Sequence, residues 1–514
     1  MLKNKRIRNA IMIVLFISCV ALAYKVGSDA LLNKRIFDLD ESLSLSLANS
    51  ELEGWVAYTP QNWFTQSFFK QYIVTDKPFN YAQVILNQTK DVHPPLYYLI
   101  LHTIFSMNPG EYTPSMAFGM NFVSYIVNTA VIYLLVSRHS KSILAPAITS
   151  VFYLSNPLVL KILTLLRMYQ LVSSFSLLFI FSGLEVVLKK KPAYILLALF
   201  TLLGGLTHYY FYYTLIAVCI VFGIILLSRK RWKSLLGSAF SVAVPALANL
   251  FVIFPATQDH LFSEDPIGAH GSYARYALSS GRINADRLKE FLSFSGLGST
   301  AFRIVLAVVM VTLFLTLFVK LKKLKLKKAF NIPLLMVSCG LFGAYCLYVL
   351  VTSQTASYIT PRYLIAGEMI MFVAVGLFIG SLPYEVPNIA LALLTCFLFS
   401  PELLNSNEGT ISSYQYAVAN GGPAIVVSDE VLSDNEAGKN FSDFMNYSAT
   451  GFLVTGQENF NPLPEDFTLY CHEGTDIKKV KPYLEKLAGK LLTFEEKTDV
   501  IATDATIYEV HHER

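Results

Sequence analysis

Residues 209–228 read YYFYYTLIAVCIVFGIILLS, and the chain continues directly into Arg229-Lys230-Arg231. The stretch contains no charged residue. It is long enough for an α-helix, rising about 1.5 Å per residue, to cross about 30 Å of hydrocarbon. Basic residues directly after such a stretch are typical of the cytoplasmic border of a membrane span. The segment therefore predicts a transmembrane helix followed by a cytoplasmic loop.

The composition of the whole chain agrees with this segment. Of the 514 residues, 54% are apolar and 15% are charged, and the mean hydropathy is +0.48. Soluble domains have about 45–50% apolar and about 25% charged residues. This balance excludes a soluble multidomain enzyme, a disordered or fibrous chain and a nucleic-acid-binding protein. It predicts a polytopic membrane protein in contact with membrane lipids.

Similar apolar windows recur along the chain and predict a mostly α, polytopic helical bundle of about eleven spans. The predicted spans are 9–30, 116–136, 142–159, 168–188, 192–207, 209–228, 235–255, 301–319, 331–351, 363–382 and 387–401. The basic start before 9–30 is compatible with a signal peptide, but no small-residue cleavage pattern follows, which favours a retained helix. Segment 94–107 is apolar but short and begins with prolines. We expect a helix at the membrane interface there.

The basic residues predict the orientation of this bundle. Nineteen of the 41 lysines and arginines stand in five clusters, at 3–8, 138–141, 189–191, 229–233 and 320–328. With the spans above, every cluster falls on one side of the membrane, which the positive-inside rule assigns to the cytoplasm. Specific binding of RNA or anionic lipid by 320–328 is the alternative to a topological anchor. The prediction is a multi-pass plasma-membrane protein with a cytoplasmic N-terminus.

The other side of the membrane receives three large segments, the loops 31–115 and 256–300 and the tail 402–514. The tail has short β-like runs at 424–428, 467–471 and 507–510 and a helical pattern near 477–491. We therefore expect two domains. Residues 1–401 would form the transmembrane module with its external loops, and 402–514 a small extracytoplasmic α/β domain.

Transport and catalysis are the two main functions open to such a chain. Transporters usually carry ionisable residues inside their spans near the midplane. Here the span interiors are almost free of them, with Glu185 and Glu368 as the main exceptions, and paired broken helices are not apparent. This pattern favours a site at the external face over a conduction path.

Polar residues from five distant segments gather at the predicted external ends of the spans. They are Asp40, Glu41, Asp91, His93, Arg167, Tyr169, His208, Arg362 and Tyr363. Carboxylates can act as general base or metal ligands. Arg and His can hold a phosphate, and interfacial Tyr suits lipid headgroups and sugar rings. Each residue also has a structural alternative: a solvated helix start for the first acids, a membrane anchor for the arginines, and a satisfied helix-end histidine for His208.

The pair Asp40-Glu41 followed by Asp91-Val92-His93-Pro94-Pro95-Leu96-Tyr97-Tyr98 resembles the GT-C integral-membrane glycosyltransferases. The group it is most similar to is family 39, which contains the protein O-mannosyltransferases and the aminoarabinose transferases. Arg167-Met168-Tyr169, Thr207-His208-Tyr209 and Pro361-Arg362-Tyr363 also resemble recurring patterns of that group. The resemblance covers residues 1–380. One departure is that a Lys occupies the position of His93 in the aminoarabinose transferases.

The resemblance implies an inverting transfer of a hexose or pentose from a polyprenyl-phosphate donor on the non-cytoplasmic face. The acceptor would be a hydroxyl of a lipid, glycan or protein. Asp40 would be the general base, and Glu41 would orient the acceptor, tune Asp40 or be structural. Asp91 and His93 would lie by the donor phosphate or support the base. Arg362, and by extension Arg167, would hold the phosphate.

Three points stay open at the level of sequence. No cofactor is certain, although Asp40, Asp91 and His93 are plausible ligands of Mg²⁺ or Mn²⁺. A lipid or polysaccharide flippase is one alternative function. A non-catalytic membrane scaffold that acts through its C-terminal domain is another.

Overall fold

The structure is a computed structural model of the 514-residue chain. It describes residues 5–32, 34, 39–50, 63–64, 73–262, 283–294, 331–356, 358–382, 424–427, 452–453, 465–472, 476–497 and 505–512. Two compact units make up the chain. The first contains Met1–Leu32, Gln88–Tyr97 and Phe118–Leu404, and the second contains Asn33–Asn87, Tyr98–Ala117 and Asn405–Arg514.

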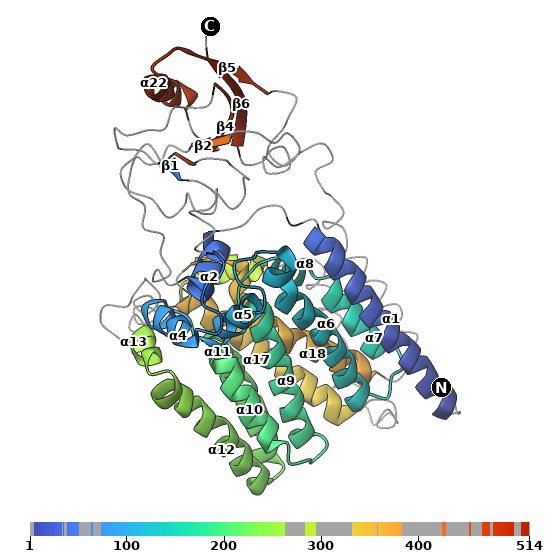
Figure 1. The fold of residues 1–514 in the computed structure, drawn as a ribbon. Helices are drawn as coiled ribbons and strands as arrows, with labels where there is room; N and C mark the ends of the chain where they lie inside the picture. Colours follow the sequence, from blue (N-terminus) through green and yellow to red (C-terminus); the bar gives the residue numbers. More distant parts are fainter. Residues whose placement is uncertain are drawn as a thin grey trace. The chain divides into compact units, whose positions relative to one another are not determined.

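The first unit is a bundle of helices (Figure 1). Its apolar helices are α1 (Lys5–Leu32), α6 (Pro114–His139), α7 (Ala145–Leu154), α8 (Pro157–Leu163), α9 (Tyr169–Val187), α10 (Tyr194–Gly205), α11 (Tyr210–Ser228), α12 (Trp232–Ala248), α17 (Ile332–Thr355) and α18 (Ile365–Ser381). Short elements are the π-helix η1 (Asn249–Ile253), α13 (Ala256–Phe262), α15 (Ala285–Phe294) and the 3₁₀ turn η3 (Pro361–Leu364).

Seven helices of the described residues are long and apolar enough to cross a membrane, or up to eight if the bent pair α7–α8 is one span. Nine of the eleven predicted spans fall on described residues, and each of them coincides with a helix or with the bent pair. The predicted span 192–207 is the shorter helix α10, which has only 12 residues. The predicted spans 301–319 and 387–401 lie outside the described residues. The predicted interfacial segment is the helix α5 (Leu96–Ser106).

Helix α18 is the centre of the bundle, because the whole apolar stretch with which it could span the membrane is buried. Glycines let its neighbours approach closely. A side chain at Gly376 would meet Val136 and Thr149 within 3.0 Å, and one at Gly380 would meet Ser140 within 2.6 Å. Close approach over small residues is the usual way in which membrane helices pack, since lipid supplies no hydrophobic drive between them. Helix α12 is the opposite case, since only 6% of the corresponding apolar stretch, which continues into η1, is buried.

The predicted span 142–159 is bent by 59° between α7 and α8. Asn156 causes the break, because its side chain accepts hydrogen bonds from the backbone amides of Leu158 and Val159 and so caps a new helix. Pro157 occupies the first turn of α8, where its missing N–H has no cost. The second helix continues to Leu163, beyond the predicted end at 159.

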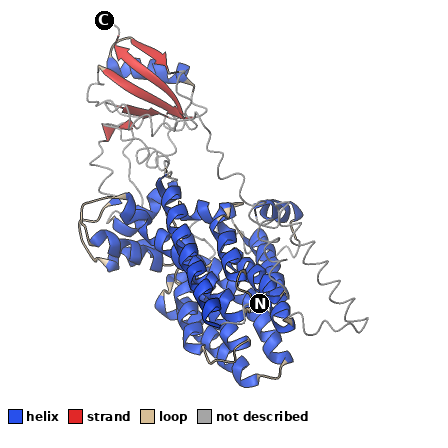
Figure 2. Cartoon of the chain, turned by 90° about the vertical axis from the view of Figure 1, so that its right-hand side faces the viewer, coloured by secondary structure: helices blue, strands red, loops and turns tan. Residues whose placement is uncertain are grey.

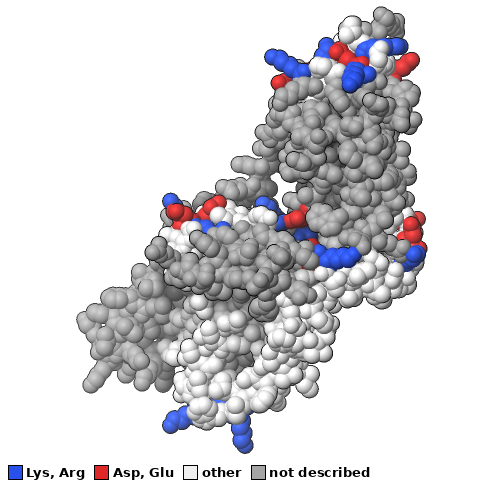
Figure 3. Space-filling model, turned by 90° about the vertical axis from the view of Figure 1, so that its left-hand side faces the viewer, with Lys and Arg blue, Asp and Glu red and all other residues white. Residues whose placement is uncertain are grey.

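Basic clusters of the sequence lie at one end of the bundle, as far as the structure describes them. Arg8 donates to the carbonyl of Lys141 at 3.1 Å, and Arg138 binds Glu185 through two bonds of 2.7 and 2.9 Å. Arg231 donates to the carbonyls of Val186 and Val187 and so caps the C-terminus of α9. In Figure 3 the described flank of the bundle is white along its length and carries Lys and Arg at its lower end.

The second unit contains the helices of the first loop and the strands of the tail. Its described helices are α2 (Leu39–Asn49), α4 (Tyr81–Lys90), α5 and α22 (Ile477–Ala488). The two-residue strand β1 (Trp63–Phe64) pairs antiparallel with β3 (Phe452–Leu453). A four-stranded sheet has the order β2 (Ala424–Val427), β4 (Asp466–His472), β6 (Ala505–His512) and β5 (Leu492–Glu496). Figure 2 shows these strands in red.

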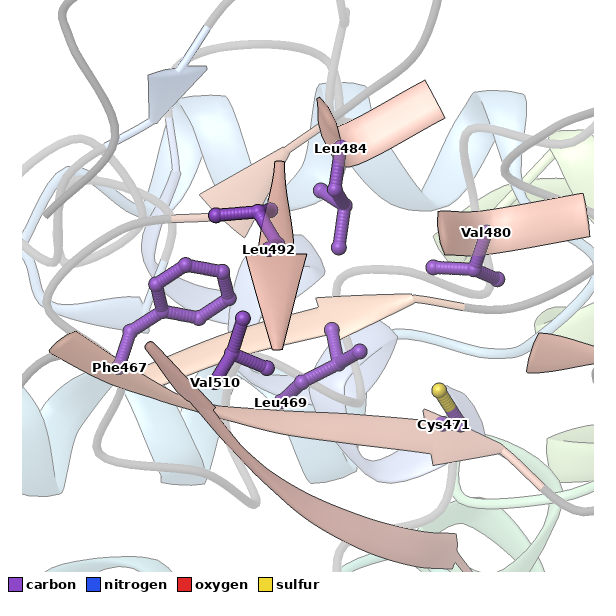
Figure 4. Packing of buried hydrophobic residues seen from close by; sticks show 7 residues of the cluster. All are labelled: Phe467, Leu469, Cys471, Val480, Leu484, Leu492 and Val510. Atoms are coloured by element: carbon purple, nitrogen blue, oxygen red, sulfur yellow. The ribbon is translucent and has the colours of Figure 1, made fainter. Parts of the chain in front are cut away.

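In this sheet β2 and β4 are parallel, and the other two pairs are antiparallel. One face of the sheet packs against α22 through a small apolar core (Figure 4). Its buried members are Phe467, Leu469, Cys471, Val480, Leu484, Leu492 and Val510. Helix α22 ends at Gly489, whose φ of +63° suits a residue without a side chain. The predicted α/β character of the tail is therefore confirmed, with β5 as an additional strand.

Candidate active site

Asp91, His93 and Arg167 form a continuous chain of polar contacts in the first unit. The carboxylate Oδ2 of Asp91 lies 2.7 Å from Nδ1 of His93. The other ring nitrogen of His93, Nε2, lies 3.3 Å from Nη2 of Arg167. A guanidinium can only donate, so Nε2 of His93 must accept, and a neutral imidazole then carries its proton on Nδ1 and gives it to Asp91. The acid thus fixes both the orientation and the tautomer of the histidine.

The carboxyl group of Asp91 is ionised in this arrangement. Burial by itself would raise the pKa of Asp91, but the contact with Nδ1 of His93, helped by the charge of Arg167, outweighs burial and lowers the pKa to about 2. This series of contacts therefore starts at the negative charge of Asp91 and ends at the positive charge of Arg167.

Arg167 lies in the turn between α8 and α9 and is only 5% exposed. Asn121 of α6 holds this turn, because its amide donates to the carbonyl of Leu165 at 2.6 Å. The backbone amide of Arg167 donates to the same carbonyl at 2.7 Å. A guanidinium held in place and withdrawn from water interacts more strongly with an anion than one on the surface.

His208 joins the group from the turn between α10 and α11. The backbone amide of Leu96 donates to the carbonyl of Leu206 at 3.0 Å, which ties the segment after His93 to this turn. The rings of His93 and His208 have centroids 5.8 Å apart. Nδ1 of His208 accepts from the amide of Tyr210 at 3.0 Å, so the neutral ring carries its proton on Nε2.

Arg362 arrives from the turn η3, just before α18, and lies among aromatic rings. Its guanidinium carbon is 5.8 Å from the ring centroid of Tyr169 and 5.6 Å from that of Tyr363. The ring of Tyr169 contacts His208 at 5.2 Å, and the ring of Tyr363 contacts Tyr210 at 4.7 Å. Aromatic faces favour a cation and restrict where it can lie. The aromatic contacts thus connect Arg362 to the histidines.

The first acidic pair belongs to the second unit, where both residues stand in the first turn of α2. The side chain of Glu41 is fully buried and accepts from Nζ of Lys34 at 2.7 Å. Asp40 is half-buried. An acid in the first turn of a helix is favoured by the helix dipole. Glu41 is therefore engaged in an ion pair, and Asp40 is the more accessible carboxylate of the two.

The structure thus brings seven of the nine predicted residues into one network and places Asp40 and Glu41 in the other unit. Among the residues that the structure describes, no three His, Cys, Asp or Glu side chains are grouped closely enough to hold a metal ion. The metal role of Asp40, Asp91 and His93 and the catalytic roles stay predictions. Sequence reasoning missed Asn121 and Lys34, since a single polar residue near a span end carries no distinctive pattern.

The structure is similar to two crystal structures of the aminoarabinose transferase ArnT from Cupriavidus metallidurans. ArnT bound to undecaprenyl phosphate matches with a TM-score of 0.51 and 12% identity over 97% of both chains. ArnT in the apo state matches with a TM-score of 0.50 and 11% identity over 97% of both chains. No protein-family model and no curated protein matches the sequence. The chain therefore has the fold of ArnT, as the predicted GT-C-like helical architecture requires.

Proposed function

We propose that this chain is an inverting glycosyltransferase that moves a sugar from a polyprenyl-phosphate carrier to an acceptor hydroxyl. The observation that carries the proposal is the network that joins Asp91, His93 and Arg167 to His208 and Arg362. It presents two cations and two imidazoles at one end of a bundle with the ArnT fold. One of the two ArnT structures contains undecaprenyl phosphate, which supports a donor of that class.

The position of the network supports a site on the non-cytoplasmic face. Arg167 precedes α9, whose other end at Val187 is capped by Arg229 and Arg231. The 19 residues of α9 extend for about 28 Å, roughly the thickness of the hydrocarbon layer. If the basic end is cytoplasmic, as the positive-inside rule predicts, the network faces the outside of the plasma membrane. The N-terminus would then be cytoplasmic and the C-terminal α/β domain extracytoplasmic.

Arg167 and Arg362 suit the donor side of the reaction. As the bond between the anomeric carbon and the phosphate oxygen breaks, the electron pair stays on the phosphate, and negative charge grows there. A preorganised guanidinium stabilises that charge more than water does, because its orientation has been set in advance. Arg can bind two phosphate oxygens at once. His93 keeps Arg167 oriented until the phosphate arrives.

Asp40 suits the acceptor side. It would take the proton of the acceptor hydroxyl while the oxygen of that hydroxyl attacks the anomeric carbon from the face opposite the phosphate. The configuration at that carbon inverts, and polyprenyl phosphate leaves. General-base help of this kind contributes about 10²–10⁴-fold. Glu41 is unsuited to the role because Lys34 occupies its carboxylate. This reaction needs no step through Mg²⁺ or Mn²⁺.

The direct test is sugar transfer by the purified full chain in lipid nanodiscs. The donors would be undecaprenyl-phosphate mannose and undecaprenyl-phosphate aminoarabinose, to separate hexosyl from pentosyl transfer. Total lipid, glycan and peptide fractions would serve as acceptors. We expect transfer with inversion and its loss in Asp40→Asn. Transfer that persists when Asp40 and Glu41 are both neutralised would overturn the proposed base. A flippase would move the lipid without transfer, and a scaffold would do neither.

Sidedness has its own test in whole cells. Lys190→Cys lies in the loop after α9, and Glu111→Cys lies in the loop before α6. A membrane-impermeant maleimide should label the variant at position 111 in intact cells and the one at position 190 only after lysis. The reverse labelling would overturn the proposed orientation while leaving the chemistry of the site untouched.

A further inference from the structure

Tyr348 stands on α17 and is fully buried against the start of α18. Its hydroxyl donates a hydrogen bond of 2.6 Å to the backbone carbonyl of Tyr363. Tyr363 directly follows Arg362 in the turn η3. The bond therefore joins a side chain of one span to the main chain of the turn that carries the arginine.

Backbone bonds also help to define the turn. They include one from the amide of Ile365 to the carbonyl of Arg362 and a long one of 3.5 Å from the amide of Tyr363 to the carbonyl of Thr360. A 3₁₀ turn has poorer hydrogen-bond geometry than an α-helix and is readily deformed. A short bond from a rigid aromatic side chain therefore helps to fix this turn.

Gly367 makes this approach possible. A side chain built at Gly367 would lie 2.2 Å from Cδ1 of the Tyr348 ring, well inside any allowed contact. Only a residue without a side chain lets the ring pack against the first turn of α18. The contact and the hydrogen bond involve the same ring, so a side chain at position 367 would push the Tyr348 hydroxyl away from the Tyr363 carbonyl.

We infer that Tyr348 is a positioning residue for the binding of phosphate by Arg362, which rests on the proposed function of the site. By donating to the carbonyl of Tyr363, Tyr348 fixes the position of the η3 backbone relative to the rings of Tyr169 and Tyr363. Arg362 then remains 5.8 and 5.6 Å from those two rings. Without the bond the turn loosens, and the guanidinium spends less time in the orientation that receives a phosphate.

A purely structural role for Tyr348 is the competing explanation, because buried tyrosine hydroxyls generally find a partner. The chain offers a matched control for it. Tyr125 of α6 is also fully buried, and its hydroxyl donates to the carbonyl of Leu154 at 3.1 Å. Tyr125→Phe removes the same type of bond between two spans without acting on η3.

The experiment measures the affinity of the full chain in nanodiscs for undecaprenyl phosphate and, separately, for undecaprenol, which has the same tail without the phosphate. Tyr348→Phe should weaken undecaprenyl phosphate binding about tenfold, the size expected for one buried hydrogen bond. It should leave undecaprenol binding unchanged. Tyr125→Phe should change neither. In an Arg362→Ala background, Tyr348→Phe should add no further loss.

Unchanged phosphate binding in Tyr348→Phe, or an equal loss in Tyr125→Phe, would overturn the inference. If Arg362→Ala itself binds the phosphate normally, then the proposed role of Arg362 fails, which is a different result. Gly367→Ala is the second variant, since it pushes the ring away from the same bond. It should reproduce the selective loss, and normal phosphate binding in it would also count against the inference.

Discussion

Arg167 donates to Nε2 of His93 across 3.3 Å, although the two residues lie 74 positions apart in the chain. The bond saturates the only free acceptor of the imidazole and occupies one of the five donors of the guanidinium. In the proposed function, other donors of the same guanidinium would bind the phosphate while His93 keeps it oriented.

Replacement of Arg167 should reduce donor use strongly. Loss of one preorganised donor to a developing anion costs about 10²–10³-fold in rate, so we expect that range for Arg167→Ala in the transfer assay. Arg167→Lys should recover only part of it, because Lys cannot contact His93 and two phosphate oxygens together. Arg138→Ala is the control, as it breaks the Glu185 ion pair at the opposite end of α9. Equal losses in both positions would mean that Arg167 acts only on the fold.

Asp91 should make the stability of the protein depend on acid. The folded protein lowers the pKa of this carboxyl from 3.8 to about 2, so the unfolded chain binds the proton more readily. The stabilisation is fully present above about pH 4 and is lost as the pH falls towards 2; it amounts to about 2 kcal/mol. Unfolding in detergent, followed from pH 6 to pH 2, should show a smaller acid loss in Asp91→Asn. Parallel curves for the two proteins would contradict the assignment.

The two acids of the first loop should behave differently. Asp40→Asn should lower the transfer rate by about 10²–10⁴-fold with donor affinity retained. Glu41→Gln should instead lower stability by about 3 kcal/mol, because it leaves Lys34 without its buried partner. Adding Lys34→Gln should restore part of that stability. Thermal unfolding and single-turnover transfer, measured on the same preparations, separate the two effects.

The sheet of the tail should depend on its small core. Leu469 is fully buried between β4 and α22, and truncation of a buried leucine costs about 2–5 kcal/mol. Leu469→Ala in the full chain should therefore expose the tail to limited proteolysis while the helical bundle stays resistant. The exposed Leu491 supplies the control, since Leu491→Ala should leave the cleavage pattern unchanged.

The helical part of the fold could be predicted from sequence, because a membrane span can be recognised from its length and apolarity alone. The tail was harder. Strand β5 went unpredicted because it lies at the edge of the sheet, buries Leu492, and ends in Glu495 and Glu496. An edge strand that turns most side chains to solvent has no apolar alternation to detect. Its pairing with β6 decides its conformation.

The candidate site could also be predicted only in part. The motifs around His93, Arg167 and His208 stood at the ends of predicted spans, so topology was enough to expect them together. Sequence could not show that Glu41 is buried against Lys34, or that Asn121 holds the turn before Arg167. Such contacts depend on the rotation and tilt of whole helices, which local patterns do not contain.

The pairing of Trp63 and Phe64 with Leu453 and Phe452 has a consequence for biogenesis. The two strands are separated by about 390 residues, which a ribosome translates in roughly 20 to 80 s at typical rates. Throughout that interval the earlier strand has no partner, while span after span enters the bilayer. The pairing between these two strands can therefore form only after the tail has been translated.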